Sequence, residues 1–294
     1  MRLLLLSCLI VLLNSAAFAK TEVKNEIPFE MLQSGHILVK AKIDGVEGRF
    51  IFDTGAGLTV FTKVFFNKLK HTVSSGSYTG FRATGERVDA DLFRVKGVQL
   101  GGFQKEEEEV SWLDFNLGDI DGILSLKLLE SQPFTIDFNK KVIVLESKQT
   151  LSAIKKIAKP MPVQLEQSRD RSLTIFSYFK INDTLTLQLS MDSGAGKDVF
   201  RINSKYLKQL NVDVNDTVRV KRIAKKSEVD TKYVSTIYLT KLNKLASAHD
   251  AAISTSNFPV QFVDGLIYDG IIWINWLGSK ITFDLQDKLL LVQQ

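Results

Sequence analysis

Two aspartates of this 294-residue chain lie in nearly the same short motif. Asp53 is followed by Thr-Gly-Ala-Gly and Asp192 by Ser-Gly-Ala-Gly, each at the end of an apolar run. A single Asp-Thr-Gly is ordinary turn chemistry, because Asp can bond its own backbone and Gly supplies positive φ. Because the motif occurs twice, it predicts a symmetric carboxylate pair. Two carboxylates brought close together share one proton and titrate as a coupled acid and base.

The rest of the chain repeats around these motifs in the same order. Residues 53–61 and 192–200 are identical at six of nine positions. Further matched segments are 42–44 with 180–182, 121–124 with 269–272, and 135–138 with 282–285. A period this long exceeds one unit of a solenoid, so it indicates a duplicated lobe. We predict an N-terminal lobe over 20–148, a connector over 149–160 and a C-terminal lobe over 161–294.

Within each lobe the sequence pattern is that of short strands. Residues 36–43 and 49–52 are rich in apolar and β-branched side chains and are separated by Asp-Gly turn chemistry. Ahead of Asp192, apolar and polar residues alternate with period two, which is typical of a strand. Helical patterns are short, at 62–70, 125–130 and 204–210. The fold we expect is all-β, in two similar lobes with short helices only.

Several of these segments resemble the retropepsin-like and pepsin-like aspartic proteases. The resemblance rests on residues 27–30, 35–39, 43–45 and 50–56, and on the apolar-Gly-apolar-apolar elements at Gly122 and Gly270. It covers nearly the whole chain beyond residue 19. It implies two β-barrel lobes related by a pseudo-twofold axis. It also implies a single-chain aspartic endopeptidase, without a cofactor, in which Asp53 and Asp192 activate a water that attacks the peptide bond.

The resemblance also assigns supporting roles within the two motifs. It implies that Thr54 and Ser193 hydrogen-bond across the lobe interface and fix the geometry of the pair. Gly55 and Gly194 let the backbone approach the carboxylates and offer N–H donors, which a side chain would obstruct. The next residue is Ala in both motifs, where many pepsins carry a hydroxyl that donates to the carboxylate. Without that donor the pair is acidified less strongly, so we expect a mildly acidic optimum.

A flap that covers the substrate is implied at 77–87, where glycines suit a mobile hairpin tip. Tyr78 and Gly80 are therefore candidate substrate-binding residues, although a tyrosine in such a place is more often an ordinary edge-strand residue. The matching stretch of the second lobe, 219–226, is rich in Lys and Arg, and we interpret it as a solvated hairpin.

Two positions depart from the family pattern. Ser125 and Trp273 stand where glycine usually follows the apolar pair. Serine is a small change, whereas the Trp273 ring could narrow the cleft, form a substrate pocket or pack between the lobes, so Trp273 is also a candidate substrate-binding residue. The alternative function is a catalytically inactive, aspartic-protease-like peptide-binding module. An actin-like ATPase, another duplicated fold, is disfavoured because the sequence predicts no long helices and predicts export to an ATP-poor compartment.

The first residues have the pattern of a secretory signal. A basic residue, an apolar run over 3–13 and Ala-Phe-Ala at 17–19 predict a signal peptide over 1–19. The apolar run is too short to span a membrane, so the chain is expected to be exported, to the periplasm or the medium. Too little apolar sequence precedes Cys8 for lipoprotein anchoring, so we interpret Cys8 as part of the apolar run.

Charge and composition exclude several partners. The net charge of +5 falls to about +4 when the predicted signal is removed, which is too mild to indicate a nucleic-acid partner. His36, His71 and His249 are scattered without ligand spacing, so we expect no metal site. The expected partner is a peptide or protein substrate, and the expected state is a monomer with two pseudo-symmetric lobes.

Overall fold

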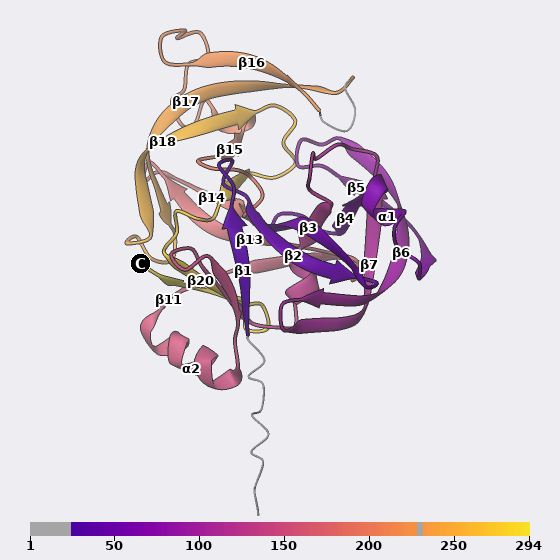
Figure 1. Cartoon of the computed structure of the whole chain (residues 1–294). Helices are drawn as coiled ribbons and strands as arrows, with labels where there is room; N and C mark the ends of the chain where they lie inside the picture. The colour runs from indigo at the N-terminus through magenta and orange to yellow at the C-terminus, as the bar shows by residue number, and fades with distance from the viewer. Residues whose placement is uncertain (1–24, 228–231) are drawn as a thin grey trace, which may run out of the picture.

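The computed structural model describes residues 25–227 and 232–294 as a mostly β chain (Figure 1). The predicted signal peptide and Cys8 lie outside the described residues. The first half contains β1 (Glu26–Met31), β2 (Ile37–Ile43), β3 (Val46–Asp53), β4 (Thr59–Thr62), α1 (Lys63–Phe66), β5 (Thr72–Phe81), β6 (Arg87–Leu100), β7 (Phe103–Leu113), β8 (Gly122–Ser125), η1 (Leu126–Leu129), β9 (Phe134–Asp137) and β10 (Val142–Leu145).

The second half repeats this series after one helix. It contains α2 (Lys148–Ile157), β11 (Lys159–Pro162), β12 (Gln164–Ser168), β13 (Ser172–Ile181), β14 (Leu185–Asp192), β15 (Phe200–Asn203), η2 (Ser204–Tyr206), β16 (Lys221–Lys226), β17 (Val234–Ser247), β18 (Ser254–Val263), β19 (Gly270–Trp273), β20 (Lys280–Asp284) and β21 (Leu289–Gln293).

The two halves have the same strand topology. The order β2-β3-β8-β4-β7-β6-β5 in the first lobe matches β13-β14-β19-β15-β18-β17-β16 in the second. In both lobes the third strand of the series runs parallel to the second, β8 to β3 and β19 to β14. An extra pairing, β2 with β6 and β13 with β17, curls each sheet back on itself. The predicted all-β fold of two similar lobes is confirmed.

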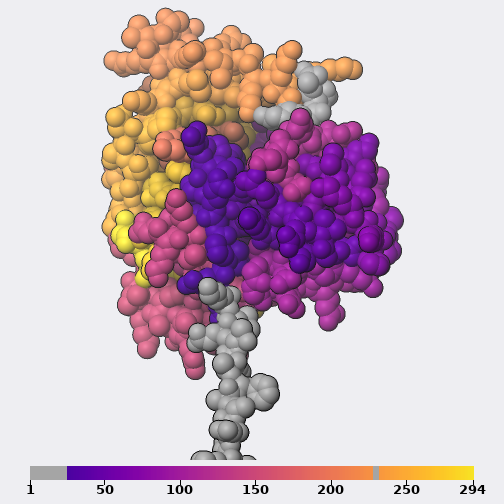
Figure 2. Space-filling view, in the orientation of Figure 1, coloured from indigo at the N-terminus to yellow at the C-terminus, as the bar shows by residue number. Residues whose placement is uncertain are grey.

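Strands from both lobes also pair with one another, in the order β11-β21-β20-β9-β10-β1, and this series continues through β1 into β2 of the first lobe. Thr135 on β9 and Thr282 on β20 are register partners, and their hydroxyls lie 2.7 Å apart. These two residues occupy equivalent positions in the sequence repeat, so the pseudo-twofold axis passes between them. The two lobes lie side by side (Figure 2) and share one hydrophobic core.

The repeated glycines of the apolar-Gly-apolar-apolar elements have a packing reason. A Cβ at Gly122 would lie 2.5 Å from the carbonyl oxygen of Val60, and one at Gly270 would lie 2.5 Å from that of Arg201. In each lobe the glycine therefore lets β8 or β19 lie directly against the backbone of its antiparallel neighbour in the sheet, β4 or β15. No other residue type fits there without moving that backbone.

The structure adds a helix that the sequence pattern did not indicate. α2 occupies most of the predicted connector 149–160 and lies outside the sheets (Figure 1). Ser147 and Thr150 cap each other's backbone N–H groups at 3.1 and 2.9 Å. The usual capping signature has Glu or Gln at the second of these positions. Because Thr150 stands there instead, the start of α2 was not recognisable from the sequence. The three predicted helical stretches are shorter than expected, as α1, η1 and η2.

Candidate active site

Asp53 and Asp192 are the last residues of equivalent strands, β3 and β14. Phe50 and Phe52 are fully buried and anchor the end of β3, as Leu189 and Met191 anchor β14. Because side chains alternate along a strand, each aspartate emerges on the face opposite the anchor that directly precedes it. The same strand end in both lobes thus presents one carboxylate to the lobe junction.

The two carboxyl groups meet there, close enough to share a proton. A Cβ at Gly55 would lie 2.4 Å from Cγ of Asp192, and one at Gly194 would lie 2.3 Å from Cγ of Asp53. Each motif therefore places its glycine against the carboxylate of the other motif. The close approach predicted for Gly55 and Gly194 is present, and any side chain at either position would displace a carboxylate.

The backbone donors around the pair are unequal. Asp53 Oδ1 accepts from the N–H groups of Gly55 at 2.8 Å and Ala56 at 3.0 Å. Asp192 Oδ1 accepts from the N–H of Gly194 at 2.6 Å. Hydrogen bonds from N–H groups favour a charged carboxylate. In a pair that shares one proton, this asymmetry favours the proton on Asp192 and the negative charge on Asp53.

The surroundings of Asp192 favour its protonated form. Burial, the neighbouring charge of Asp53 and a hydrogen bond that the protonated Asp192 donates to Asp53 together raise the pKa of Asp192 well above its usual range. Asp192 as a residue is half-buried. Asp192 can therefore hold a proton where a free aspartic acid would have lost it.

A pH-dependent stability follows from this raised pKa. The folded chain binds a proton at Asp192 that the unfolded chain has lost, so this carboxyl stabilises the fold fully below about pH 4 and loses that contribution as pH rises through its folded pKa. We expect the free energy of unfolding of the wild type, measured in urea from about pH 4 to about pH 8, to fall relative to Asp192→Asn. Parallel curves for the two proteins would contradict the raised pKa.

Thr54 and Ser193 join the two motifs by four buried hydrogen bonds. The Thr54 hydroxyl donates to the Met191 carbonyl at 2.9 Å and accepts from the Ser193 N–H at 2.9 Å. The Ser193 hydroxyl donates to the Phe52 carbonyl at 2.9 Å and accepts from the Thr54 N–H at 3.0 Å. Both side chains are fully buried. The structure thus contains the cross-lobe hydrogen bonds that the resemblance implied.

The predicted flap is the hairpin of β5 and β6, and it reaches the second lobe. The Tyr78 hydroxyl lies 3.1 Å from Oγ of Ser172, while Gly80 leaves room for the Tyr78 ring. At the tip, the Ala83 carbonyl accepts from the N–H of Ile267 at 2.9 Å. The flap therefore bridges the lobes both along its strand and at its tip. Contact of Tyr78 and Gly80 with a substrate stays a prediction.

The two departures from the family pattern have different partners. The Ser125 hydroxyl donates to the Ala56 carbonyl at 2.6 Å, beside the Asp53 motif of its own lobe. Trp273, next to Asp192 in register, donates from its indole Nε1 to the Gly35 carbonyl of the other lobe at 3.3 Å. Of the three possibilities for Trp273, the structure shows packing between the lobes. Its part in substrate binding stays a prediction.

Sequence reasoning missed one neighbour of the second motif. The sequence presents His36 as one of three scattered histidines, yet its Nε2 lies 3.0 Å from the Gly194 carbonyl oxygen. The residues that join here are far apart in the sequence. The position of His36 at the start of a strand-like run gives no indication of this contact.

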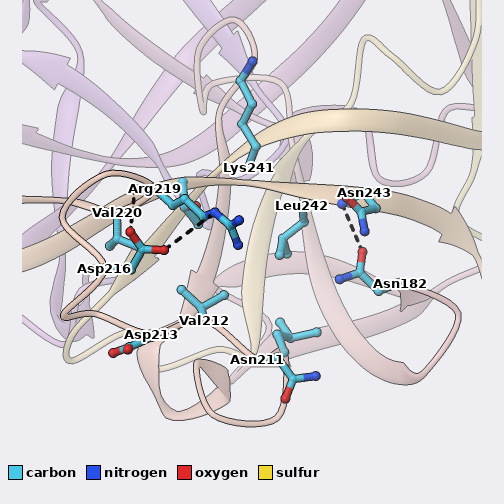
Figure 3. A pocket seen from close by; sticks show the side chains of 12 residues that line it. Asn182, Asn211, Val212, Asp213, Asp216, Arg219, Val220, Lys241, Leu242 and Asn243 are labelled. Carbon is cyan, nitrogen blue, oxygen red and sulfur yellow. Dashed lines mark hydrogen bonds and ion pairs between the residues drawn. The ribbon is translucent and has the colours of Figure 1, made fainter.

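A separate hollow has none of the predicted site residues in its lining (Figure 3). Asp216 lies 3.6 Å from Arg219 there and accepts backbone N–H groups of its own turn. Asn182 accepts from the N–H groups of Asn243 and Lys244. These polar groups are engaged in holding the loops around the hollow.

Two further properties concern the described part of the chain. Between residues 25 and 227 and from 232 onward, no three His, Cys, Asp or Glu side chains gather so that they could hold a metal ion. Over the same ranges, no helix combines the length and the apolar character needed to cross a membrane.

Comparison with known proteins gives a matching family model and a similar fold. The family model described as aspartyl protease matches residues 39–128, which include the Asp53 motif. A solved structure titled "Crystal structure of edgp" is similar with a TM-score of 0.53 at 9% identity, over 90% of this chain and 93% of that chain. At this identity the likeness concerns the fold. No curated protein matches the chain.

Proposed function

Since the chain is aspartyl protease-like in family and fold, we propose that it is an aspartic endopeptidase that hydrolyses peptide bonds with the Asp53–Asp192 pair. The observation that carries the proposal is the close approach of the two carboxyl groups, with each motif's glycine against the carboxyl group of the other motif. A carboxyl pair of this kind holds one proton and can accept and donate protons in one step. Aspartic proteases are themselves the established example of two carboxylates that share a proton in this way.

The chemistry follows from the unequal surroundings of the two groups. A water between them loses a proton to Asp53 as its oxygen attacks the carbonyl carbon of the peptide, while Asp192 gives its proton to the carbonyl oxygen. The tetrahedral intermediate then collapses. The peptide nitrogen takes a proton from Asp53 and leaves as an amine, and the hydroxyl returns its proton to Asp192. Both carboxyls are then in their starting states.

The proposal includes the form and location in which the chain works. One lobe supplies Asp53 and the other Asp192, so a single chain holds a complete pair and a monomer suffices. The leader pattern at 1–19 supports export. N-terminal sequencing of the exported protein should begin at Lys20, and a mature protein retained inside cells with its leader intact would oppose export.

We expect the pH profile to peak in the mildly acidic range. Ala56 and Ala195 stand where a hydroxyl could donate to each carboxylate, and the raised pKa of Asp192 extends its protonated form toward neutral pH. The measurement is kcat/KM against pH on one peptide. A maximum below about pH 3 would contradict the expectation.

The function itself is tested with a mixed peptide library. The purified chain, without residues 1–19, is incubated with the library across pH and the products are identified by mass spectrometry. Cleavage that is inhibited by a hydroxyl-bearing transition-state mimic supports the proposal, because tight binding of such mimics reports transition-state complementarity. Peptides that bind but remain intact at every pH would instead indicate a binding module.

A further inference from the structure

His36 belongs to a turn of the first lobe that lies against the Asp192 motif of the second. The turn, residues 32–36, connects β1 to β2 and is closed by the Gly35 N–H, which donates to the Leu32 carbonyl at 2.8 Å. The Ser34 carbonyl accepts from the N–H of Lys197 at 2.7 Å. A Cβ at Gly35 would lie 2.5 Å from that same nitrogen. The turn is thus fitted directly to the backbone that follows Asp192.

The hydrogen bonds of the His36 ring define which nitrogen carries the proton. Nε2 lies 3.0 Å from the Gly194 carbonyl oxygen, which can only accept, so Nε2 must donate. Nδ1 lies 2.7 Å from Oγ of Ser34, whose hydroxyl can donate to it. The neutral ring therefore has its proton on Nε2. The Gly194 carbonyl therefore determines the tautomer, and the Ser34 hydroxyl serves the unprotonated Nδ1.

The two aspartate motifs are held in different ways. In the first lobe, the Ser125 hydroxyl holds the Ala56 carbonyl from within the same lobe. The matching position in the second lobe is Trp273, which has no hydroxyl and instead donates to the Gly35 carbonyl. The second motif therefore lacks a hydroxyl like the one that bonds the first motif. Instead, His36 of the other lobe bonds the Gly194 carbonyl, and Trp273 bonds the turn that contains His36.

From this geometry we infer that His36 is a positioning residue for Asp192, acting through the Gly194 backbone. The inference rests on the proposed function. Gly194 donates from its N–H to Asp192 Oδ1 at 2.6 Å, while its carbonyl is held by His36. The ring thus holds one side of Gly194 while the other side holds Asp192, so Gly194 links His36 to the carboxyl that gives its proton to the substrate. His36 has no contact with the reacting atoms in this arrangement.

Two substitutions of His36, whose side-chain amides differ in length, test the inference. In His36→Gln the side-chain N–H can reach the position of Nε2, whereas in His36→Asn it stops near the position of Nδ1. We expect His36→Asn to lower kcat by about 10-fold to 100-fold with KM within about twofold of wild type, since small displacements of a catalytic group are that costly. His36→Gln should retain most of the wild-type kcat. His249→Leu, at an exposed histidine, serves as the matched control.

A second readout does not depend on turnover. Long-range ¹H–¹⁵N NMR at neutral pH should show the Nε2–H tautomer for His36. The amide signals of Gly194 and Ala195 should move in His36→Asn and stay near their wild-type positions in His36→Gln. Equal kcat for the two variants, with unchanged Gly194 signals in both, would overturn the inference. If the wild type cleaves no peptide while these NMR results hold, the proposed function fails and the positioning by His36 stands.

Discussion

Asparagine in place of Asp53 or Asp192 is expected to lower kcat by about 10³-fold or more, at or near the loss of all measurable cleavage. Loss of a positioned acid or base costs about 10²-fold to 10⁴-fold, and here one group serves as both in turn. Asparagine has nearly the same shape as aspartic acid but cannot exchange the proton. Because the two carboxyls act as one unit, the double variant should be little worse than either single variant.

The control for this experiment is an aspartate close in sequence. Asp198 is exposed and adopts φ +56°, a conformation that asparagine also tolerates. Asp198→Asn should keep the wild-type kcat and KM on the same peptide. Cleavage by Asp53→Asn at the wild-type rate would show that the chemistry does not depend on the pair.

Thr54→Val is expected to cause the largest loss of stability among the substitutions considered. Valine matches threonine in shape but removes the hydroxyl that serves the Ser193 N–H and the Met191 carbonyl. Each buried backbone group left without a partner costs about 1–3 kcal/mol, so the two together predict a loss of about 2–6 kcal/mol. The free energy of unfolding in urea measures the loss.

Serine at the same position provides the comparison. Thr54→Ser keeps the hydroxyl and should lose far less stability than Thr54→Val. Ser193→Ala removes the partner hydroxyl from the Thr54 N–H and the Phe52 carbonyl, so it should resemble Thr54→Val. A Thr54→Val protein within about 0.5 kcal/mol of wild type would show that these bonds do not hold the lobes together.

The parts of the fold that were predictable are those with a repeated local signal. Asp53 and Asp192 are recognisable because each terminates an apolar strand in a nearly identical motif. Gly122 and Gly270 are recognisable because the same close approach of neighbouring strands requires glycine in both lobes. The repeat therefore carries the topology, since two matching series of local signals imply two matching sets of strands.

The features that escaped prediction depend on unusual local chemistry or on distant contacts. The start of α2 uses Thr150 where Glu or Gln is the common signature, so its capping is not recognisable from the sequence. His36 and Trp273 bond residues of the opposite lobe, and the sequence around each of them does not indicate which residue it contacts. Their roles become visible only when the second motif is compared with the first in space.

The most direct test of the account is a titration of the Asp192 carboxyl. Carbon-13 NMR of the side-chain carboxyl across pH, in the wild type and in Asp53→Asn, follows its protonation. We expect the pKa of Asp192 to lie well above the usual range in the wild type and to fall in Asp53→Asn, where the neighbouring charge is gone. An ordinary and unchanged pKa in both proteins would show that the two lobes do not form one shared acid–base pair.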